Sequence, residues 1–453
     1  MYRRCSILAA ASSLATCFLT AAISAGQPPQ APGPQTSTPE RPSWPEWRGP
    51  QRDGSIPAAA VPAAWPKQLR RQWRVEVGEG HASPVVAGSR VFVLSRQGDD
   101  EVVQALALAD GKPLWSRRYP APYEPSPYAG PHGKGPRSTP AVAGQRLVTV
   151  GVGSIVSCWD TASGKLLWQR DFAKDFKPAS SLFYGMSVSP VIVPFLGVGR
   201  AYNADGTRSE MVRAPRAIVY VGVSGDGALM ALNLETGHTE WAWKADGPGY
   251  ASPIPATLAA VPQLVLQSQK ACIGIGPSDG KLLWSIPFET RYDQNIVTPV
   301  VVRDLVVFAG LSNPTAAYRF ERAQGAWPPK EAWRNEAIQL YMSSPVAVGN
   351  LLFGLASRSK GLFFCLDATT GKTQWTSEGG QGENAALLAA GQAVLALTTN
   401  AELIVFKAQP EQFEVLAKYT VSDTPTWAHP AVVPGRILIK DRSTLASWVV
   451  DGR

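Results

Sequence analysis

Histidines are the side chains of this sequence best suited to metal binding or acid–base catalysis, and the chain has 4 of them. They are His81, His132, His238 and His429. A metal-binding helix of a zinc hydrolase would place two histidines at i and i+4, and no such pair occurs. No Gly-x-Ser-x-Gly segment occurs either, which excludes the exposed serine nucleophile of many hydrolases. The sequence therefore predicts no catalytic residue and no metal site.

Polar and aromatic side chains recur shortly before a series of Ser-Pro, Thr-Pro and His-Pro dipeptides. These side chains are His81, Arg137, Tyr184, Tyr250, Asn295, Tyr341 and Trp427. The segment 120–135 precedes one of the dipeptides and adds Tyr123, Tyr128, His132 and Lys134. Aromatic faces with a few hydrogen-bond donors suit a small molecule or a peptide. We therefore predict that the first set and His132 form a binding site, the alternative being that they only cap the ends of strands.

The dipeptides mark an internal repeat, which is the first organisation to look for in a long chain. Six copies begin with Ser-Pro or Thr-Pro, at residues 83, 139, 189, 252, 298 and 344, and a looser copy begins at His429. Five segments also share a polar residue, a glycine, three residues and a tryptophan, ending at Trp115, Trp168, Trp241, Trp284 and Trp375. A dipeptide that ends in glycine between two apolar runs predicts a tight turn between strands.

One repeat unit contains four short strands, at residues 84–87, 90–95 and 102–108 and around Trp115. Four antiparallel strands per unit, repeated every forty to seventy residues or roughly so, describe one blade of a β-propeller. Units that start near residues 83, 139, 189, 252, 298, 344, 385 and 429 make eight blades. The predicted fold is an all-β, eight-bladed propeller over residues 44–453, and the candidate binding residues should meet at one mouth of its central channel.

Three units depart from this pattern. Unit three carries a polar insertion, residues 195–216, which we predict as an exposed loop. Unit five reaches Trp333 through a proline-containing insertion, residues 311–330. Unit seven has no Gly-x-x-x-Trp segment, and its fourth strand is assigned to residues 413–417.

The last unit has room for only three strands before the chain ends. Residues 72–77 form a spare strand near the N-terminus, and Trp73 matches the tryptophan of the other fourth strands. Pairing the two ends would close the ring and remove two open sheet edges. We therefore predict that the propeller is closed by an N-terminal strand.

The N-terminus has the pattern of a secretory signal peptide. Arg3 and Arg4 precede an apolar stretch, residues 7–23, and small residues follow. We predict a signal peptide at residues 1–25 and a proline-rich linker at residues 26–43, hence a secreted or periplasmic protein. A retained membrane anchor is the alternative, although the stretch is short for a spanning helix.

Three cysteines remain beyond the predicted signal peptide: Cys158, Cys272 and Cys365. Counting back ten residues from the repeat tryptophans gives small residues only, namely Ala105, Cys158, Ala231, Gly274 and Cys365. Cys158 and Cys365 therefore belong to equivalent positions on far sides of the ring, too distant for a disulfide. We predict three buried, unpaired thiols. Cys17 lies within the signal peptide, and its flanking residues argue against lipid anchoring.

Composition is consistent with this architecture. The 453 residues include 41 glycines and 39 prolines, and only 17% are charged against roughly 25% in an average soluble chain. These values exclude a disordered protein and a helical bundle. The net charge of +8 is spread over the chain, with no run of Lys and Arg longer than two. We therefore expect no nucleic-acid partner, no further membrane span and a monomer.

The repeat resembles that of the pyrroloquinoline-quinone-type β-propellers, and segments 135–140 and 44–54 resemble secreted bacterial members of that superfamily. The resemblance implies that the repeat tryptophans are docking positions packed between neighbouring blades. Burying a large aromatic side chain there is also favourable on physical grounds alone. These residues are Trp73, Trp115, Trp168, Trp241, Trp284, Trp333 and Trp375.

The superfamily includes quinoprotein dehydrogenases, with bound quinone and calcium, and non-enzymatic members such as the propeller lipoprotein of the outer-membrane barrel-assembly machinery. The calcium-dependent alcohol dehydrogenases have two adjacent cysteines against the quinone, and this chain has none. Carboxylates near unit three do not form a matching cluster; they are Asp205, Glu210, Asp226 and Glu235.

The prediction is a non-catalytic scaffold without a cofactor, which binds an envelope protein or a small ligand at the channel mouth. The alternative is a dehydrogenase that uses pyrroloquinoline quinone with calcium at a reorganised site. Glycan binding through the tyrosine and tryptophan side chains of the mouth is a third, weaker interpretation.

Overall fold

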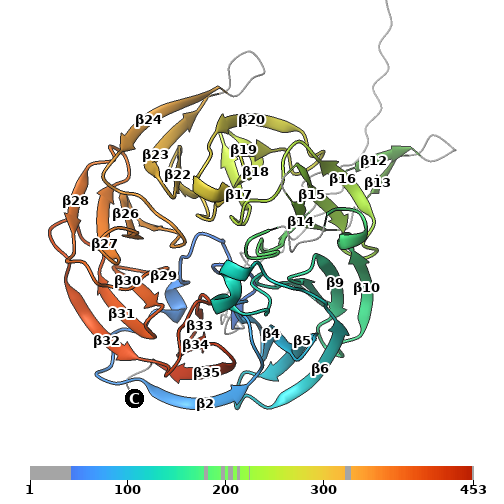
Figure 1. The fold of residues 1–453 in the computed structure, drawn as a ribbon, viewed down its shortest axis with the longest axis horizontal. Helices are drawn as coiled ribbons and strands as arrows, with labels where there is room; N and C mark the ends of the chain where they lie inside the picture. Colours follow the sequence, from blue (N-terminus) through green and yellow to red (C-terminus); the bar gives the residue numbers. More distant parts are fainter. Residues whose placement is uncertain are drawn as a thin grey trace, which may run out of the picture. The chain divides into compact units, whose positions relative to one another are not determined.

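Eight antiparallel sheets radiate around a common centre in the computed structural model of the chain (Figure 1). The structure describes residues 42–450 except 178–181, 195–198, 203–207, 212–214, 224 and 322–327. The predicted signal peptide and residues 26–41 of the predicted linker lie outside the described residues. The predicted eight-bladed propeller is confirmed.

Each blade runs from an inner strand at the channel to an outer strand at the rim. Blade 1 contains β3 (Val85–Ala87), β4 (Arg90–Gln97), β5 (Asp100–Ala107) and β6 (Pro113–Pro120). Blade 2 contains β7 (Ala141–Ala143), β8 (Arg146–Val150), β9 (Ile155–Asp160) and β10 (Leu166–Asp171). Blade 3 contains β11 (Val191–Val193), β14 (Arg216–Val223), β15 (Asp226–Asn233) and β16 (Thr239–Trp243). Blade 4 contains β17 (Ile254–Leu258), β18 (Val261–Gln267), β19 (Ala271–Ile275) and β20 (Leu282–Pro287).

The second half of the ring repeats the same order. Blade 5 contains β21 (Val300–Val302), β22 (Leu305–Gly310), β23 (Asn313–Phe320) and β24 (Pro329–Asn335). Blade 6 contains β25 (Val346–Val348), β26 (Leu351–Ala356), β27 (Leu362–Asp367) and β28 (Thr373–Thr376). Blade 7 contains β29 (Ala385–Ala390), β30 (Ala393–Thr398), β31 (Glu402–Lys407) and β32 (Val415–Thr420). Blade 8 contains β33 (Ala431–Val433), β34 (Arg436–Lys440), β35 (Thr444–Val449) and, from the N-terminal part of the chain, β2 (Arg70–Glu76).

Burial along the strands explains why the sequence alternates in some strands and not in others. The middle strands β14 and β15 are buried along almost their whole length, because neighbouring blades cover both faces. The outer strand β16 buries only Trp241 fully and leaves its other side chains partly or largely exposed. Apolar middle strands and mixed outer strands are what packing between blades requires.

The ring closes as predicted, through pairing of β2 with β35. In this register Trp73 lies opposite Ser447, and Val75 lies opposite Leu445. The outer strand of blade 8 is thus supplied by residues more than 350 positions away in the chain. Because β2 completes the last blade, no three-stranded blade with an open edge remains where the two ends of the chain meet.

Repeat tryptophans pack onto the turn glycines of the following blade. The pairs are Trp73 with Gly111, Trp115 with Gly164, Trp168 with Gly237, Trp241 with Gly280 and Trp333 with Gly371. A Cβ atom on any of these glycines would lie 2.4–2.8 Å from the indole, and their φ angles of +69° to +75° also favour glycine. Trp284 differs, since its indole nitrogen donates to Gln263 Oε1 of its own blade.

The position ten residues before each tryptophan is small because it pairs directly with the indole-bearing residue. Ala105, Cys158, Ala231, Gly274 and Cys365 lie opposite Trp115, Trp168, Trp241, Trp284 and Trp375 respectively. The three cysteines are buried and free, as predicted. Burial raises the pKa of Cys158 and of Cys365 to about 12.

The insertions differ in detail from their prediction. Within residues 311–330, the described part includes β23 and the start of β24. The fourth strand of blade 7 is β32, which begins two residues later than predicted. Within the segment 195–216, β12 (Gly199–Tyr202) pairs with β13 (Arg208–Met211), and Arg216 begins β14 as a buried residue. The exposed-loop prediction was therefore wrong for Arg216, because this buried side chain contacts Glu240 in its own blade and the carbonyls of Pro277 and Ser278 in blade 4.

Candidate functional site

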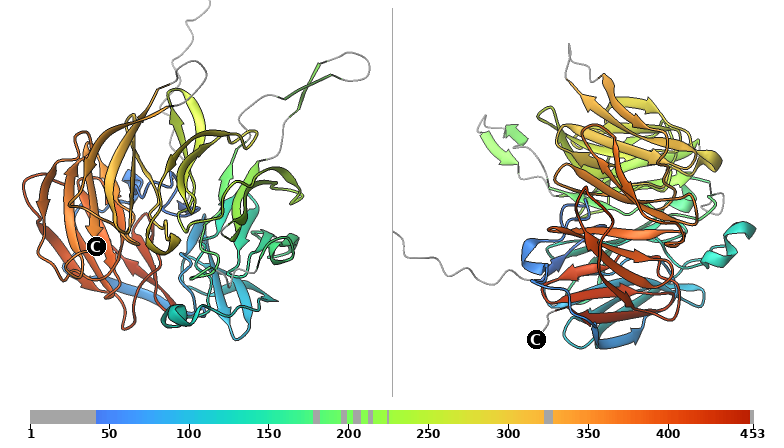
Figure 2. Two further views of the ribbon diagram at one scale, coloured as in Figure 1. Left: turned by 45° about the horizontal axis from the view of Figure 1, so that its top comes forward. Right: turned by 90° about the vertical axis from the view of Figure 1, so that its left-hand side faces the viewer.

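A segment ahead of the first blade fills the central channel from one end. It begins with β1 (Ser43–Trp44), which pairs with β3, and it continues to the turn η1 (Ala58–Ala60). Figure 2 shows η1, in blue, on one face of the ring and the turn η2 (Pro127–His132), in teal, on the other. We call residues 44–56 the plug. Ser43, predicted as linker, is thus part of the folded domain.

Two buried arginines, Arg48 and Arg52, fix the plug to the inner strands. Arg52 donates to Glu46 Oε2 at 2.9 Å and to the carbonyls of Pro190 and Pro253 at 2.9 and 3.0 Å. Arg48 donates to the Pro345 carbonyl. Burial lowers the pKa of both arginines, and burial raises the pKa of Glu46 in spite of its contact with Arg52. These contacts connect the plug to blades 3, 4 and 6.

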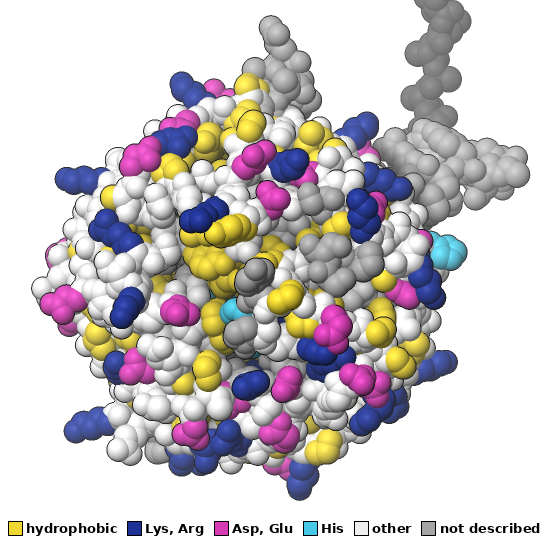
Figure 3. Space-filling model, in the orientation of Figure 1, with side chains coloured by type: hydrophobic (Ala, Val, Ile, Leu, Met, Phe, Trp, Pro, Cys, Tyr) yellow, Lys and Arg dark blue, Asp and Glu magenta, His cyan; other side chains and the backbone are white. Residues whose placement is uncertain are grey.

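A cavity of about 150 Å³ opens at the opposite end, and Trp47 of the plug is part of its wall. The Trp47 indole donates to Thr298 Oγ1 at 3.3 Å, and its ring lies 4.3 Å from that of His429. Figure 3 shows apolar side chains and a histidine gathered near the centre of this face. The cavity lining consists of Trp47, His81, His132, Arg137, Tyr184, Ser187, Tyr250, Ser252, Ile296, Met342, Ser344 and Trp427.

Seven of these residues occupy one register position of the repeat. They lie two residues before the Ser, Thr or His that begins a blade: His81, Arg137, Ser187, Tyr250, Ile296, Met342 and Trp427. The main chain enters each inner strand in the same way, so the side chain at this position turns toward the channel axis. This strict offset is the signal that could have found Ser187, Ile296 and Met342 from the sequence.

Most of the predicted binding residues line this cavity, and two do not. Asn295 is buried and donates its amide group to the carbonyls of Ser268, Gln269 and Phe288, at 2.7–3.1 Å. Tyr341 lies behind the wall, where its hydroxyl is 3.2 Å from that of Tyr184. Both residues lie three positions before their Ser or Thr, which turns their side chains away from the cavity. The side chain of Tyr128 is outside the described residues.

Hydroxyl groups at the start of several blades join neighbouring blades to one another. The amides of Ser83, Thr139 and Ser189 donate to the hydroxyls of Thr139, Ser189 and Ser252 in the following blade, at 2.9–3.1 Å. The Thr298 amide donates to Ser344 Oγ in the same way. The Ser-Pro and Thr-Pro dipeptides thus connect blades 1 to 4 in series and blade 5 to blade 6, and this explains why a hydroxyl recurs there.

Arg137 brings positive charge into an otherwise neutral wall. Its guanidinium donates to the Gly133 carbonyl at 2.9 Å, and more distantly to His132 and Gly135. Burial lowers the pKa of Arg137. Burial and the nearby Arg137 also lower the pKa of His81 to about 3, so this imidazole is neutral at physiological pH. The pKa of His132 is lowered for the same two reasons.

Aromatic rings surround this charge. The His132 ring lies 5.0 Å from Trp427 and 5.1 Å from Tyr184, both edge to face. Tyr184 lies 5.6 Å from Tyr250 in a similar geometry. Such edge-to-face pairs stabilise a fixed wall. The site is therefore preformed, with one cation beside a largely apolar surface.

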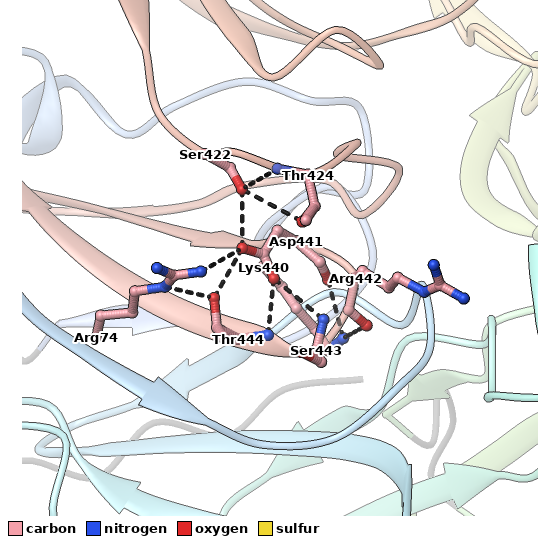
Figure 4. Close-up of polar contacts among 8 residues, drawn as sticks. All are labelled: Arg74, Ser422, Thr424, Lys440, Asp441, Arg442, Ser443 and Thr444. Atoms are coloured by element: carbon pink, nitrogen blue, oxygen red, sulfur yellow. Dashed lines mark hydrogen bonds and ion pairs between the residues drawn. The ribbon is translucent and has the colours of Figure 1, made fainter.

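A second polar cluster lies at the seam where the ring closes (Figure 4). Asp441 accepts from Ser422 and Thr444 at 2.8 Å, and Arg74 of β2 donates to Thr444 Oγ1 at 2.9 Å. Lys440 is buried and donates to the Gly80 carbonyl at 2.6 Å, and burial lowers its pKa to about 8. Each of these groups has a protein partner, so the cluster holds blade 8 to the N-terminal segment.

The cavity does not fit a quinone held by calcium. Calcium takes six to eight oxygen ligands or about that number, usually including carboxylates. The described residues that line the cavity include no Asp or Glu. Across the described part of the chain, no three His, Cys, Asp or Glu side chains lie close enough to hold a metal ion. A volume of about 150 Å³ is also below the 300–1,000 Å³ or so typical of small-molecule sites.

Solved structures of low sequence identity share the fold of this chain. BamB from Moraxella catarrhalis superimposes with a TM-score of 0.57 and 13% identity, over 85% of this chain and 98% of that one. The computationally designed Ika8 protein gives a TM-score of 0.52 with 10% identity, over 84% and 100% of the two chains. The quinohemoprotein alcohol dehydrogenase from Comamonas testosteroni gives 0.48 with 15% identity, over 91% and 81%.

Sequence comparison agrees on the family. A search of curated proteins finds no match. None of the described helices is long and apolar enough to cross a membrane. The family model described as outer membrane protein assembly factor BamB matches residues 66–127 and 99–377, which together cover more than half of the chain. The resemblance to the quinone-type propellers is therefore confirmed, and the chain belongs to the BamB family of propeller proteins.

Proposed function

We propose that the chain is a secreted, non-catalytic scaffold of the cell envelope, which binds a partner protein at the mouth of its channel. Membership in a family described as an outer-membrane assembly factor supports a binding role in the envelope. The signal-peptide pattern at residues 1–25 supports secretion. No cofactor is needed for such a role.

The mouth cavity is the observation that carries the proposal. It joins two tryptophans, two tyrosines and one arginine at a single depression. These three residue types dominate the binding energy of protein interfaces, particularly where a side chain of the partner enters a desolvated pocket. The plug closes the channel beneath the cavity, so a partner can enter only from the mouth.

Photo-crosslinking in the native envelope tests this proposal. A benzoylphenylalanine at position 427, in the cavity wall, should give an adduct of defined mass on irradiation. The same group at position 114 is the control, because Leu114 is 50% exposed on the outer strand β6. The double variant Arg137→Ala/Tyr250→Ala should abolish the adduct at position 427 while leaving the circular dichroism spectrum unchanged. Equal adducts at both positions, or none at position 427, would contradict a binding role for the mouth.

The dehydrogenase alternative is tested separately. Purified protein is mixed with pyrroloquinoline quinone, calcium, an artificial electron acceptor dye and a panel of alcohols and sugars. We expect no dye reduction above that of the quinone alone. Reduction that depends on both the protein and the quinone would place the chain among the enzymes.

A further inference from the structure

We infer that the mouth cavity binds the C-terminal residue of a partner chain, with Arg137 pairing with the terminal carboxylate and the aromatic wall enclosing its apolar side chain. This inference rests on the proposed binding function and specifies the chemistry of the bound group.

Charge comes first. Among the described residues that line the cavity, Arg137 is the side chain that is charged at neutral pH, because His81 is neutral there. Its guanidinium donates to main-chain carbonyls and interacts with the Tyr123 hydroxyl, and these neutral groups satisfy hydrogen bonds but do not neutralise the charge. Glu79 lies on an adjoining wall, where it lines a neighbouring cavity together with Arg442 of opposite charge. A desolvated cation of this kind favours an anionic ligand, and a carboxylate matches the planar guanidinium in a two-point contact.

The size of the cavity limits the rest of the ligand. An apolar cavity of about 150 Å³ holds a group as large as benzene. That volume accommodates one large side chain and excludes a multi-ring cofactor. Tyr250, Ile296 and Met342 pack together as an apolar arc of the wall at the entries to blades 4, 5 and 6, whereas Arg137 precedes blade 2. The ligand therefore combines one carboxylate with one apolar group of about the size of a phenyl ring.

The position within a protein where one residue carries both groups is the C-terminus. An internal Asp or Glu has the carboxylate but lacks the apolar group, and an internal Phe or Leu has the reverse. A chain end also suits a cavity closed below by Trp47, because the chain has to enter and need not leave. A free small molecule with a carboxylate and an aromatic ring shares this chemistry. The experiment separates such a molecule from the end of a protein chain.

Fluorescence of the wall tryptophans, Trp47 and Trp427, gives the binding readout. The probe is the pentapeptide Gly-Ser-Gly-Ser-Phe, titrated onto the full chain as a free acid and as its C-terminal amide. We expect saturable binding of the acid. The amide should bind with an affinity lower by about tenfold or more, because a charge-assisted hydrogen bond is lost. N-acetylphenylalanine, the small-ligand probe, should bind more weakly than the peptide acid.

Variants assign the effect to Arg137. Arg137→Gln should weaken binding of the acid to the level of the amide, whereas Arg137→Lys should retain part of the preference. Arg442→Gln is the matched control, since Arg442 lines the neighbouring cavity and is exposed. Thermal unfolding of each variant verifies that the fold is intact.

Each contrary outcome is specific. Equal affinity for acid and amide would overturn the carboxylate contact. Equal affinity for N-acetylphenylalanine and the peptide acid would overturn the assignment to a chain end in favour of a small ligand. No binding of any probe, with a positive crosslink at position 427, would overturn the inferred ligand class and leave the proposed scaffold function standing.

Discussion

Replacing Arg52 with methionine should release the plug from the channel. The Arg52 side chain has no exposed surface, and it contacts Glu46 and the carbonyls of Ser189, Pro190 and Pro253. The variant leaves the Glu46 carboxylate, which is only 15% exposed, without its cation. Breaking a buried pair on one side costs about 3–5 kcal/mol. The orphaned carbonyls add to this cost unless water enters.

Because the plug is a local segment, the cost should appear as local opening before global unfolding. Hydrogen exchange measured by mass spectrometry over residues 44–56 is the assay. A loss of about 3 kcal/mol corresponds to exchange that is faster by about a hundredfold. Exchange in the middle strand β31 of blade 7, which does not contact Arg52, should change far less.

Matched variants make the result interpretable. Arg74→Met removes an arginine that is 36% exposed and pairs with Asp441, so it should cost about 1 kcal/mol or less and leave exchange in the plug unchanged. Glu46→Gln/Arg52→Met should cost less than Arg52→Met alone, because no unpaired charge remains. Unchanged exchange over residues 44–56 in Arg52→Met would refute the view that this arginine holds the plug.

Three further predictions concern closure, thiols and pH. Deletion of residues 1–42 should leave unfolding cooperative. Trp73→Ala should lower the free energy of unfolding by about 3–5 kcal/mol, as measured by guanidinium titration, because it empties the contact between blades 8 and 1. Equal stability of the two variants would contradict closure by β2. A chain that lacks residues 1–25 should show no reactive thiol when native and three when denatured without reductant, and a count of one would reveal a disulfide. Burial and Arg48 lower the pKa of His429 to about 3, below its unfolded value of about 6.5. Between about pH 3 and 6.5 the native state therefore binds fewer protons than the unfolded state. The contribution of His429 to the free energy of unfolding is complete above about pH 6.5 and is lost as pH falls toward 3, by up to about 1.4 kcal/mol per pH unit. Urea titrations at pH 6.5 and 5 should show a smaller loss for His429→Gln than for the unchanged chain, and parallel losses would exclude this histidine as the cause.

The fold could be predicted because its determinants repeat along the chain. Five blades share the turn glycine and the outer tryptophan, so a pattern too weak in one unit becomes clear over several. The same regularity places Trp73 in the last blade and a small residue opposite each tryptophan. The packing contacts inferred for one blade therefore apply to nearly all of them.

The plug could not be predicted in this way, because it occurs once and its partners are distant in the chain. Arg48 and Arg52 look like surface residues in a segment rich in charge and proline. Their acceptors are carbonyls of residues 190, 253 and 345, which lie 138, 201 and 297 positions away. Only closure of the ring brings these carbonyls together, so no sequence window contains the information.

Within the candidate site, the choice of residues by chemical type was less accurate than choice by position would have been. Selection for polar and aromatic side chains included Asn295 and Tyr341, which lie three residues before the blade start and turn away from the cavity. It omitted Ile296 and Met342, which lie two residues before the blade start and line it. Geometry of the main chain, set by the repeat, decides which side chains reach the cavity.

Repetition and its interruption together account for the character of the cavity. The repeat places seven side chains at one height around the axis, and because their types differ, the ring acquires one cation at Arg137 and an apolar arc at Ile296 and Met342. The plug, which is not part of the repeat, supplies Trp47 and closes one end. A symmetric fold alone would give an open channel with equivalent walls. The single-ended, one-sided cavity therefore follows from unequal residues at an equivalent position together with one segment that breaks the symmetry.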